Sequence, residues 1–300
     1  MKIGFYSQNF SVLGRYWEKL KELADCWWGV PEKRLYETLI KKGVKKLSFY
    51  SEKHIKDYKT KKGNQFISTD PLKFQKKIAD EIDPDIWIAD TPNLLNVIPR
   101  KVPKIQTLHS LPIKKHVFYK PVLDYDLILL PGQYHKDQFI NRFNLDNNDE
   151  RLQIVGWPRI DNLICNNFDR DKIMEKIGLD RNKKTIMYAP TWGWGAGNNN
   201  FFCRWVDQEI KALEKLCKTA ADENLNFIIR LHSLSFSANN KALIDITKKY
   251  NVKWQTTETS NFQDDPNEYL WITDILISDL SGIISEFMVL DRPIIYIDPD

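Results

Sequence analysis

The sequence lacks the residue patterns of the common metal and disulfide sites. Its four cysteines are scattered without a CxxC pair, and its five histidines show no HExxH spacing. These absences argue against a structural zinc site and against a disulfide framework. Apart from Asp298 and Asp300 at the end of the sequence, which we take as non-ligands, no DxD-like carboxylate pair stands at the end of an expected strand, so we expect no bound metal. A reducing cytoplasm is the compartment that fits this cysteine usage best.

Long apolar runs are also missing. No stretch approaches the roughly 20 apolar residues that cross a bilayer, and the first ten residues, MKIGFYSQNF, read as a strand start rather than a secretory signal. There is no low-complexity tract and no internal repeat. The chain has 300 residues, of which 42% are hydrophobic and 28% charged. This composition is ordinary for a globular protein and leaves room for two domains.

Positive charge is concentrated in one region. Residues 33–77 carry thirteen lysines and one arginine against four acidic residues, a local net charge of +10, whereas the whole chain carries +4. A solvated face is the simplest interpretation. The alternative is a surface that meets an anionic membrane or an acidic polymer. No nucleic-acid-binding module accompanies the charge, so we do not expect a nucleic-acid partner.

Short apolar strands alternate with helices along the chain. In the first half, strands are predicted at residues 2–7, 47–50, 85–89, 104–108, 126–130 and 152–155, and helices at 13–24, 35–40, 73–82 and 135–143. Trp27 and Trp28 fall at the end of the first helix, where buried packing is their expected role. This alternation predicts an α/β fold with parallel strands. The opening unit is Rossmann-like, although no GxGxxG is present.

The same alternation of strands and helices resumes after a polar segment at residues 162–182, which we expect to bridge two domains. Strands are expected at 185–189, 227–231, 252–255, 275–278 and 293–297, and helices at 206–224, 242–249 and 283–290. A glycine-rich loop follows the first of these strands. We place the domain boundary near Phe168, which gives a domain at 1–168 and a second at 169–300.

The C-terminal run, residues 271–300, contains a candidate anion site. Its polar turn joins a buried strand to a helix, and Ser281 is the expected N-cap. Free N–H groups at a helix start suit phosphate. Glu286 falls one turn into the helix, within reach of ribose hydroxyls. The remaining residues of this candidate site are Ser278, Asp279 and Gly282. A capped βαβ unit without a ligand is the equally simple alternative.

Other polar residues follow the expected strands. His109, Thr191 and His232 each come directly after or near the end of one strand, and Arg159 lies in the turn after another. Ligands bind beyond the carboxyl ends of parallel strands. A single such histidine is more often structural, but two of them in consecutive α/β halves favour a ligand cleft.

Five stretches, in this order and spacing, resemble the CDP-glycerol glycerophosphotransferase family of teichoic acid and capsule synthesis. They are LHSLPIKK (108–115), VGWPRIDNL (155–163), MYAPTW (187–192), IIRLHS (228–233) and TDILISDLSGIISEFMVLDRPIIYIDPD (273–300). The resemblance implies a GT-B fold, with two Rossmann-like domains facing a cleft. The first domain would be on the acceptor side and the second would bind the nucleotide donor. Because such second domains continue further, we expect this one to be C-terminally incomplete.

The resemblance also implies a reaction and residue roles. An acceptor hydroxyl would attack the β-phosphorus of a CDP-activated polyol, such as CDP-glycerol, and release CMP without a cofactor. His109 would be the general base and His232 would stabilise the phosphate charge. The expected donor-binding residues are Arg159, Pro190, Thr191, Trp192, Arg230, Ser278, Asp279, Ser281, Gly282 and Glu286. The implied acceptor is a polyol phosphate or glycan, and the implied location is cytoplasmic, peripheral on the inner face of a bacterial membrane.

Two other interpretations stay open. His109-Ser110, His232-Ser233, Ser281-Gly282 and Glu286 depart from the residues usual in that family. Gly282 and Glu286 also resemble other GT-B enzymes, which leaves a nucleotide-sugar glycosyltransferase or a UDP-sugar 2-epimerase as alternatives. A non-catalytic nucleotide-binding module is the third interpretation.

Overall fold

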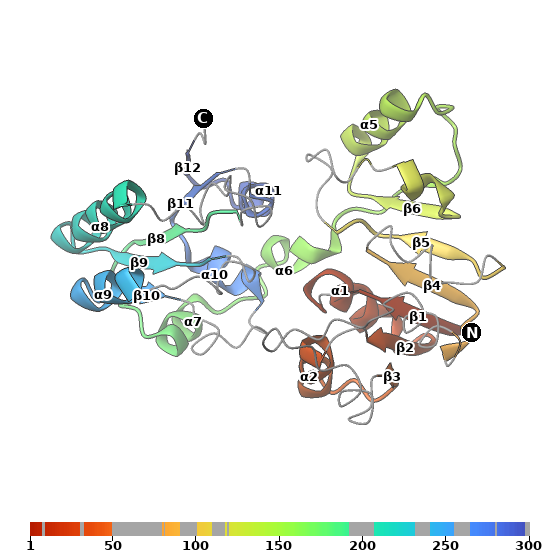
Figure 1. The fold of residues 1–300 in the computed structure, drawn as a ribbon, viewed down its shortest axis with the longest axis horizontal. Coiled ribbons are helices and arrows are strands. Elements are labelled where there is room, and N and C mark those ends of the chain that lie inside the picture. Colours follow the sequence, from red (N-terminus) through yellow and green to blue (C-terminus); the bar gives the residue numbers. More distant parts are fainter. Residues whose placement is uncertain are drawn as a thin grey trace. The chain divides into compact units, whose positions relative to one another are not determined.

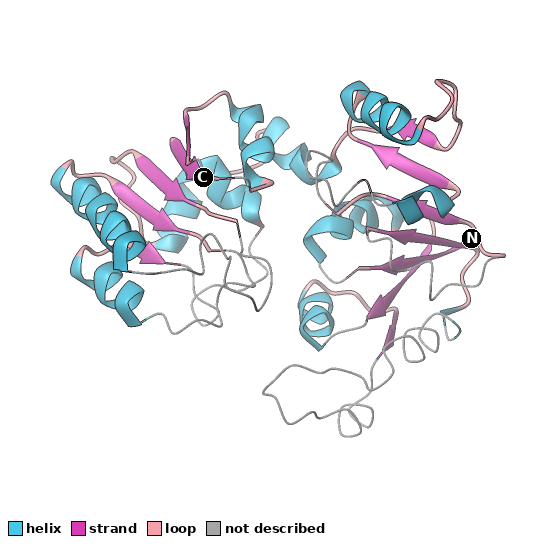
Figure 2. Cartoon of the chain, turned by 45° about the horizontal axis from the view of Figure 1, so that its top comes forward, coloured by secondary structure: helices cyan, strands magenta, loops and turns pink. Residues whose placement is uncertain are grey.

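The chain forms two compact units, Met1–Arg159 and Ile160–Asp300 (Figure 1). The computed structural model describes residues 1–7, 10–30, 33–49, 80, 82–90, 101–109, 118, 120–191, 207–231, 241–254, 265–279 and 281–297. Each unit contains a parallel sheet with helices packed on it (Figure 2). The α/β prediction is therefore confirmed.

The first unit is built on a seven-stranded sheet in the order β3-β2-β1-β4-β5-β6-β7, with every neighbouring pair parallel. Its strands are β1 (Lys2–Tyr6), β2 (Asp25–Val30), β3 (Leu47–Phe49), β4 (Ile86–Ala89), β5 (Lys104–Gln106), β6 (Leu127–Leu130) and β7 (Leu152–Ile154). Its helices are α1 (Phe10–Leu20), α2 (Lys33–Lys41) and α5 (Gln133–Phe143), with 3-10 turns η3 (Lys120–Asp124) and η4 (Pro158–Ile160). Strand sequences such as IWIA and LILL are apolar throughout because helices cover both faces of a parallel sheet.

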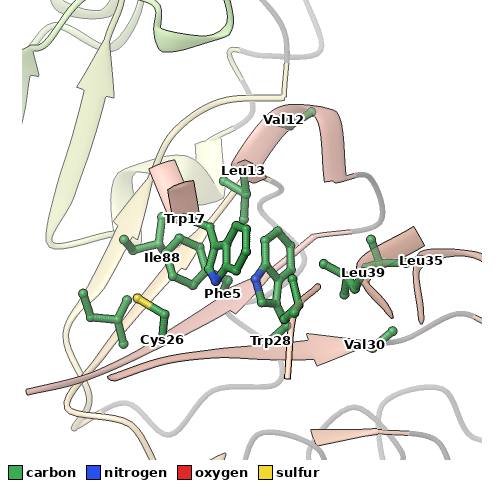
Figure 3. Close-up of a cluster of buried hydrophobic side chains, with 12 residues drawn as sticks. Phe5, Val12, Leu13, Trp17, Cys26, Trp28, Val30, Leu35, Leu39 and Ile88 are labelled. Carbon is green, nitrogen blue, oxygen red and sulfur yellow. The ribbon is translucent and has the colours of Figure 1, made fainter. Parts of the chain in front are cut away.

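The prediction that Trp27 and Trp28 end a helix is wrong, because both lie in β2. Helix α1 stops at Leu20, and in β2 the apolar side chains then follow the two-residue period of a strand. Trp28 is fully buried and stacks on Phe5 of β1, with ring centroids 5.3 Å apart. Trp17 of α1 packs into the same cluster (Figure 3). The expected burial is thus confirmed for Trp28, and Trp27 is partly buried against the opposite core cluster.

The second unit carries a five-stranded parallel sheet in the order β10-β9-β8-β11-β12. Its strands are β8 (Thr185–Tyr188), β9 (Asn226–Ile229), β10 (Lys253–Trp254), β11 (Ile275–Ser278) and β12 (Ile294–Tyr296). Its helices are α6 (Asp161–Ile164), α7 (Arg170–Ile177), α8 (Asp207–Asp222), α9 (Lys241–Lys249), α10 (Pro266–Ile272) and α11 (Ile283–Phe287), with the 3-10 turn η6 (Met288–Leu290).

The expected polar bridge at residues 162–182 is instead folded structure. It contains α7, which begins at an Asp169 cap that accepts the Lys172 N–H at 3.2 Å and ends at Gly178 with φ of 74°. Phe168 packs on Trp271 of α10, with ring centroids 6.2 Å apart. The division of the chain therefore falls before Ile160 rather than near Phe168, because the bridge is packed on the second unit.

Two further differences concern helices. Helix α10 was not expected, although Asp265 caps it by accepting the Asn267 N–H at 3.0 Å and Pro266 occupies its first turn. The helix expected at 73–82 falls almost entirely outside the described residues. None of the helices in the described part of the chain is long and apolar enough to span a bilayer.

In both sheets, the direction in which successive strands are added reverses at one internal position. In the first sheet the order runs outward from β1 on one side and from β4 on the other, and in the second sheet from β8 and β11. The loops that leave such neighbouring strands diverge to opposite sides of the sheet. A crevice at the carboxyl ends of those strands is the usual ligand position in this architecture.

A carboxylate at the opposite end of the second sheet ties its elements together. Asp274 precedes β11 and accepts the Thr185 N–H of β8 at 2.8 Å and the Arg170 guanidinium of α7 at 2.9 Å. Burial by itself raises the pKa of Asp274, but the Thr185 hydrogen bond and the charge of Arg170 outweigh it and hold the pKa below its ordinary value of 3.8.

Because the folded pKa is lowered, the stability from Asp274 is present above pH 3.8 and is lost as the pH falls through the folded value. We expect Asp274→Asn to lower the free energy of unfolding at neutral pH by about 1–2 kcal/mol and to flatten its decline in acid. Urea unfolding at neutral and acidic pH measures both effects. Asp245→Asn, at an exposed position of α9, is the matched control. Equal acid sensitivity in Asp274→Asn and the unmodified protein would contradict a lowered pKa of Asp274 in the folded protein.

Candidate active site

Ser7 and Asp90 lie side by side at the reversal point of the first sheet. Each follows its strand directly, β1 for Ser7 and β4 for Asp90, and the last residues of these strands, Tyr6 and Ala89, are register partners. The Ser7 hydroxyl donates to Asp90 Oδ2 at 2.9 Å. Strand order, rather than proximity in sequence, brings these two polar side chains together.

His109 completes this cluster from the next strand. It comes three residues after β5, the neighbour of β4, and its Nδ1 lies 3.0 Å from Asp90 Oδ2. The Asp90 side chain is fully buried, whereas the His109 side chain is 49% exposed. We assign the proton to Nδ1 because a carboxylate only accepts hydrogen bonds. Nε2 is then a lone-pair acceptor, which is the form that a general base requires.

The Asp90 charge acts on its apolar surroundings as well. Tyr125, a buried residue after η3, has its pKa raised by burial and by the negative charge of Asp90. Asp90 Oδ1 has no hydrogen-bond partner among the described residues. A buried carboxylate with so few donors relies on its two contacts at Oδ2.

The backbone that presents His109 is tightly held. Thr107 donates to the Ala89 carbonyl through its N–H at 2.8 Å and through Oγ1 at 3.3 Å. Leu108 then adopts φ of 62°, a left-handed conformation that costs a non-glycine residue about 1–2 kcal/mol. The Gln106 side chain accepts the Leu108 N–H at 3.0 Å. Residues 106–109 are thus fixed to the strand that carries Asp90.

At the reversal point of the second sheet, side chains bond to backbone instead. Ser278 Oγ at the end of β11 donates to the Ala189 carbonyl at 2.6 Å. Asp279 Oδ1 accepts the Thr191 N–H at 2.8 Å. Ser278, Asp279 and Pro190 are buried. The structure therefore brings together four of the predicted site residues, Pro190, Thr191, Ser278 and Asp279, at the ends of β8 and β11.

The expected phosphate turn differs from the prediction. The prediction of Ser281 as the N-cap is wrong, because Gly282 occupies that position and makes no side-chain cap bond. A turn hydrogen bond just before the helix runs from the Ile284 N–H to the Ser281 carbonyl at 3.2 Å. The α-helix has five residues and continues as η6, so its dipole is weaker than that of the helix expected over 283–290.

Gly282 and Glu286 occupy contrasting surroundings in this turn. Gly282 has an ordinary φ of −61°, and a Cβ added there would meet no atom of the described residues within 4 Å. Glu286 is buried. Space beside Gly282 is compatible with a ligand that approaches the backbone.

Some of the remaining predicted site residues lie outside the described part of the chain. Arg230 follows β9, and its guanidinium lies 4.8 Å from the ring centroid of Tyr269 in α10, a cation–π contact. Arg159 ends the first unit in η4. Trp192 and His232 lie outside the described residues. Within the described ranges, no group of three or more His, Cys, Asp or Glu side chains could hold a metal ion.

Asp90 and Ser7 are the residues that sequence reasoning missed. Asp90 directly follows the apolar run at 85–89, so it satisfies the same strand-end criterion that selected His109. Ser7 likewise ends the first strand. Applying that criterion to every strand, rather than to histidines and turns, would have found both.

The two parallel sheets, each with polar side chains at its reversal point, place the protein in the GT-B class of α/β folds. The wall teichoic acid polymerase TagF has this fold: the structures superpose with a TM-score of 0.62 at 19% identity, over 98% of this chain and 69% of TagF. UDP-N-acetylglucosamine 2-epimerase from Rickettsia bellii superposes with a TM-score of 0.60 at 14% identity, over 98% of this chain and 78% of the epimerase.

Sequence comparison gives the family. Residues 4–300 match the family described as CDP-Glycerol:Poly(glycerophosphate) glycerophosphotransferase, and the chain belongs to this family. The teichoic acid poly(glycerol phosphate) polymerase of Bacillus spizizenii (strain ATCC 23059 / NRRL B-14472 / W23) is 28% identical over 227 residues, which is 67% of this chain and 53% of the polymerase. The teichoic acid glycerol-phosphate transferase of Staphylococcus aureus (strain NCTC 8325 / PS 47) is 28% identical over 238 residues, 70% of this chain and 56% of that transferase. The chain thus spans about half the length of these relatives.

Proposed function

We propose that the protein transfers a polyol phosphate, such as glycerol phosphate, from a CDP-activated donor to an acceptor hydroxyl in the synthesis of a cell-wall or capsular polymer. Membership of the glycerophosphotransferase family supports this reaction class. One TagF structure comes from a histidine-to-asparagine variant soaked with CDPG. The observation that carries the proposal is the pairing of His109 with buried Asp90 at the reversal point of the first sheet.

In the proposed reaction, the acceptor oxygen attacks the β-phosphorus of the donor as its proton passes to His109 Nε2. The bond between the β-phosphorus and the bridging oxygen breaks, and CMP leaves. Asp90 holds the imidazole in the tautomer that accepts at Nε2 and stabilises the imidazolium that forms. The step needs neither an oxidant nor a cofactor. The nucleotide donor is split in the reaction and is therefore a substrate.

We assign donor binding to the second unit and to Arg159, which directly precedes it in the chain, and acceptor activation to the rest of the first unit. Phosphate charge that develops at the β-phosphorus requires N–H dipoles or cations nearby. The proposed donor-side residues are Arg159, Pro190, Thr191, Trp192, Arg230, His232, Ser278, Asp279, Ser281, Gly282 and Glu286. Support is strongest for Thr191, Ser278 and Asp279, which meet at the reversal point of the second sheet.

We further propose a cytoplasmic location with peripheral contact to an anionic membrane. Lys41, Lys42 and Lys45 are exposed where α2 ends, and the rest of the lysine-rich region lies largely outside the described residues. Clustered lysines each add about 1 kcal/mol to binding at an anionic surface. Co-sedimentation with phosphatidylglycerol vesicles, but not with phosphatidylcholine vesicles, is expected. Equal recovery with both lipids would contradict the contact.

Removal of the proposed base should slow turnover without weakening donor binding. We expect His109→Ala to lower kcat by about 10²–10⁴-fold and Asp90→Asn to lower it by at least about tenfold, since the imidazole loses its orienting carboxylate. Calorimetric donor Kd should stay near that of the unmodified protein in both variants. Glu150→Gln, an exposed change in the same unit, is the control. Normal kcat in His109→Ala would show that another group is the base.

Gly282→Ala tests the donor site without a folding penalty. The added methyl meets no atom of the described part of the chain and φ is ordinary, so thermal stability should not fall. If donor phosphates approach this backbone, the methyl should reduce or abolish the thermal shift produced by CDP-glycerol. An undiminished shift would remove Gly282 from the site.

The same thermal-shift measurement separates the alternative functions when it covers CDP-glycerol, CDP-ribitol, UDP-GlcNAc and CMP. Stabilisation by the CDP-polyols is expected. Preference for UDP-GlcNAc would favour a glycosyltransferase or an epimerase-like enzyme, whose fold the chain shares. Stabilisation by CDP-polyols without any CMP release in the presence of acceptor would favour a non-catalytic nucleotide-binding module.

A further inference from the structure

Leu108 has a backbone conformation that its residue type does not favour. Seven non-glycine residues in the described part of the chain have positive φ, and the other six are asparagine or aspartate. Those two residue types tolerate the left-handed region because their short polar side chains bond locally, whereas leucine has no such compensation. This exception lies immediately before His109. Strain of this kind persists only where its surroundings impose it.

The Gln106 side chain is bonded to the backbone of Leu108. Gln106 ends β5 with 1% exposure, and its Oε1 accepts the N–H of Leu108 at 3.0 Å. This hydrogen bond links the Gln106 side chain to the backbone two residues later, on the far side of Thr107. The Leu108 side chain, 2% exposed, packs in the core cluster with Val122 and Tyr125. Gln106 Nε2 is buried without a hydrogen-bond partner among the described residues. Among the described residues, the hydrogen bond of this buried amide side chain is therefore the one to Leu108.

The turn has a direct consequence for His109. Thr107 is bonded to the Ala89 carbonyl, and Ala89 immediately precedes Asp90. From that fixed point the left-handed residue sends the Leu108 side chain into the core and leaves His109 half exposed with Nδ1 on Asp90 Oδ2. If Leu108 relaxed to negative φ, the chain would leave Thr107 in another direction, and both side chains could not keep these positions.

We propose that Gln106 is a positioning residue for the His109 base, acting through the left-handed Leu108. The predicted effect of Gln106 on turnover rests on the role of His109 in the proposed function. The structural part of the proposal, that the Gln106–Leu108 bond holds the imidazole on Asp90, stands independently. The proposal concerns a side chain that acts through the backbone of Leu108.

Gln106→Met tests the proposal, because methionine fills a similar volume and removes the acceptor. Nitrogen NMR of the His109 ring, assigned by comparison with His109→Ala, reports the tautomer directly. We expect the unmodified protein to show the Nδ1–H form and Gln106→Met to show a mixture of tautomers. We also expect kcat to fall by about tenfold or more with unchanged donor Kd, since small displacements of a catalytic group are costly. Gln106→Glu, which keeps an acceptor oxygen, should restore the Nδ1–H form.

Two further variants separate positioning from general loss of stability. Leu152→Ala removes a side chain from the same core cluster and should lower Tm while leaving the tautomer and kcat unchanged. In a Leu108→Gly background, where positive φ costs nothing, adding Gln106→Met should change the tautomer and kcat much less than it does with leucine present. This comparison also covers the case in which Gln106→Met alone folds poorly.

The outcomes distinguish this inference from the proposed function. An unchanged Nδ1–H tautomer in Gln106→Met, or an equal effect of that change with leucine and with glycine at position 108, would overturn the positioning role. A changed tautomer with unchanged kcat would uphold the positioning role and contradict His109 as the base.

Discussion

The site in the first unit depends on one buried carboxylate. Asp90 places a negative charge in a region that water does not reach, which is unfavourable unless donors satisfy it. Ser7 and His109 supply those donors, and each comes from the end of a strand adjacent to β4. The pairing therefore requires β1, β4 and β5 in this order. It also leaves the exposed Nε2 of His109 as the acceptor that a hydroxyl nucleophile needs.

The second unit repeats the topology with different chemistry. At its reversal point Ser278 and Asp279 bond to the backbone at Ala189 and Thr191, and these bonds fix the shape of the loop ends. Rigid backbone at the ends of β8 and β11 suits the binding of a nucleotide whose phosphates are read by N–H groups. The His109–Asp90 pair in one unit and the backbone hydrogen bonds in the other are consistent with a transferase of the family to which the chain belongs.

The sequence predicted the α/β class and nearly every strand, because parallel strands are short apolar runs that stand out from amphipathic helices. It failed at β2, whose aromatic residues continue the preceding helical pattern, and at Ser281, where the helix begins one residue later than its best capping residue. His109 was identified from its place after a strand. Asp90 lies nineteen residues away, and its contact with His109 depends on strand order and on the left-handed Leu108, which local patterns do not encode.

General-base catalysis by His109 is the central claim, and chemical rescue tests it most directly. His109→Gly opens a space for a free imidazole, which can take the proton in place of the missing side chain. The account predicts that added imidazoles restore turnover and that, across a substituted series, the second-order rescue rate rises with imidazole basicity. A variant that no imidazole rescues, or whose rescue is independent of basicity while donor binding stays intact, would contradict it.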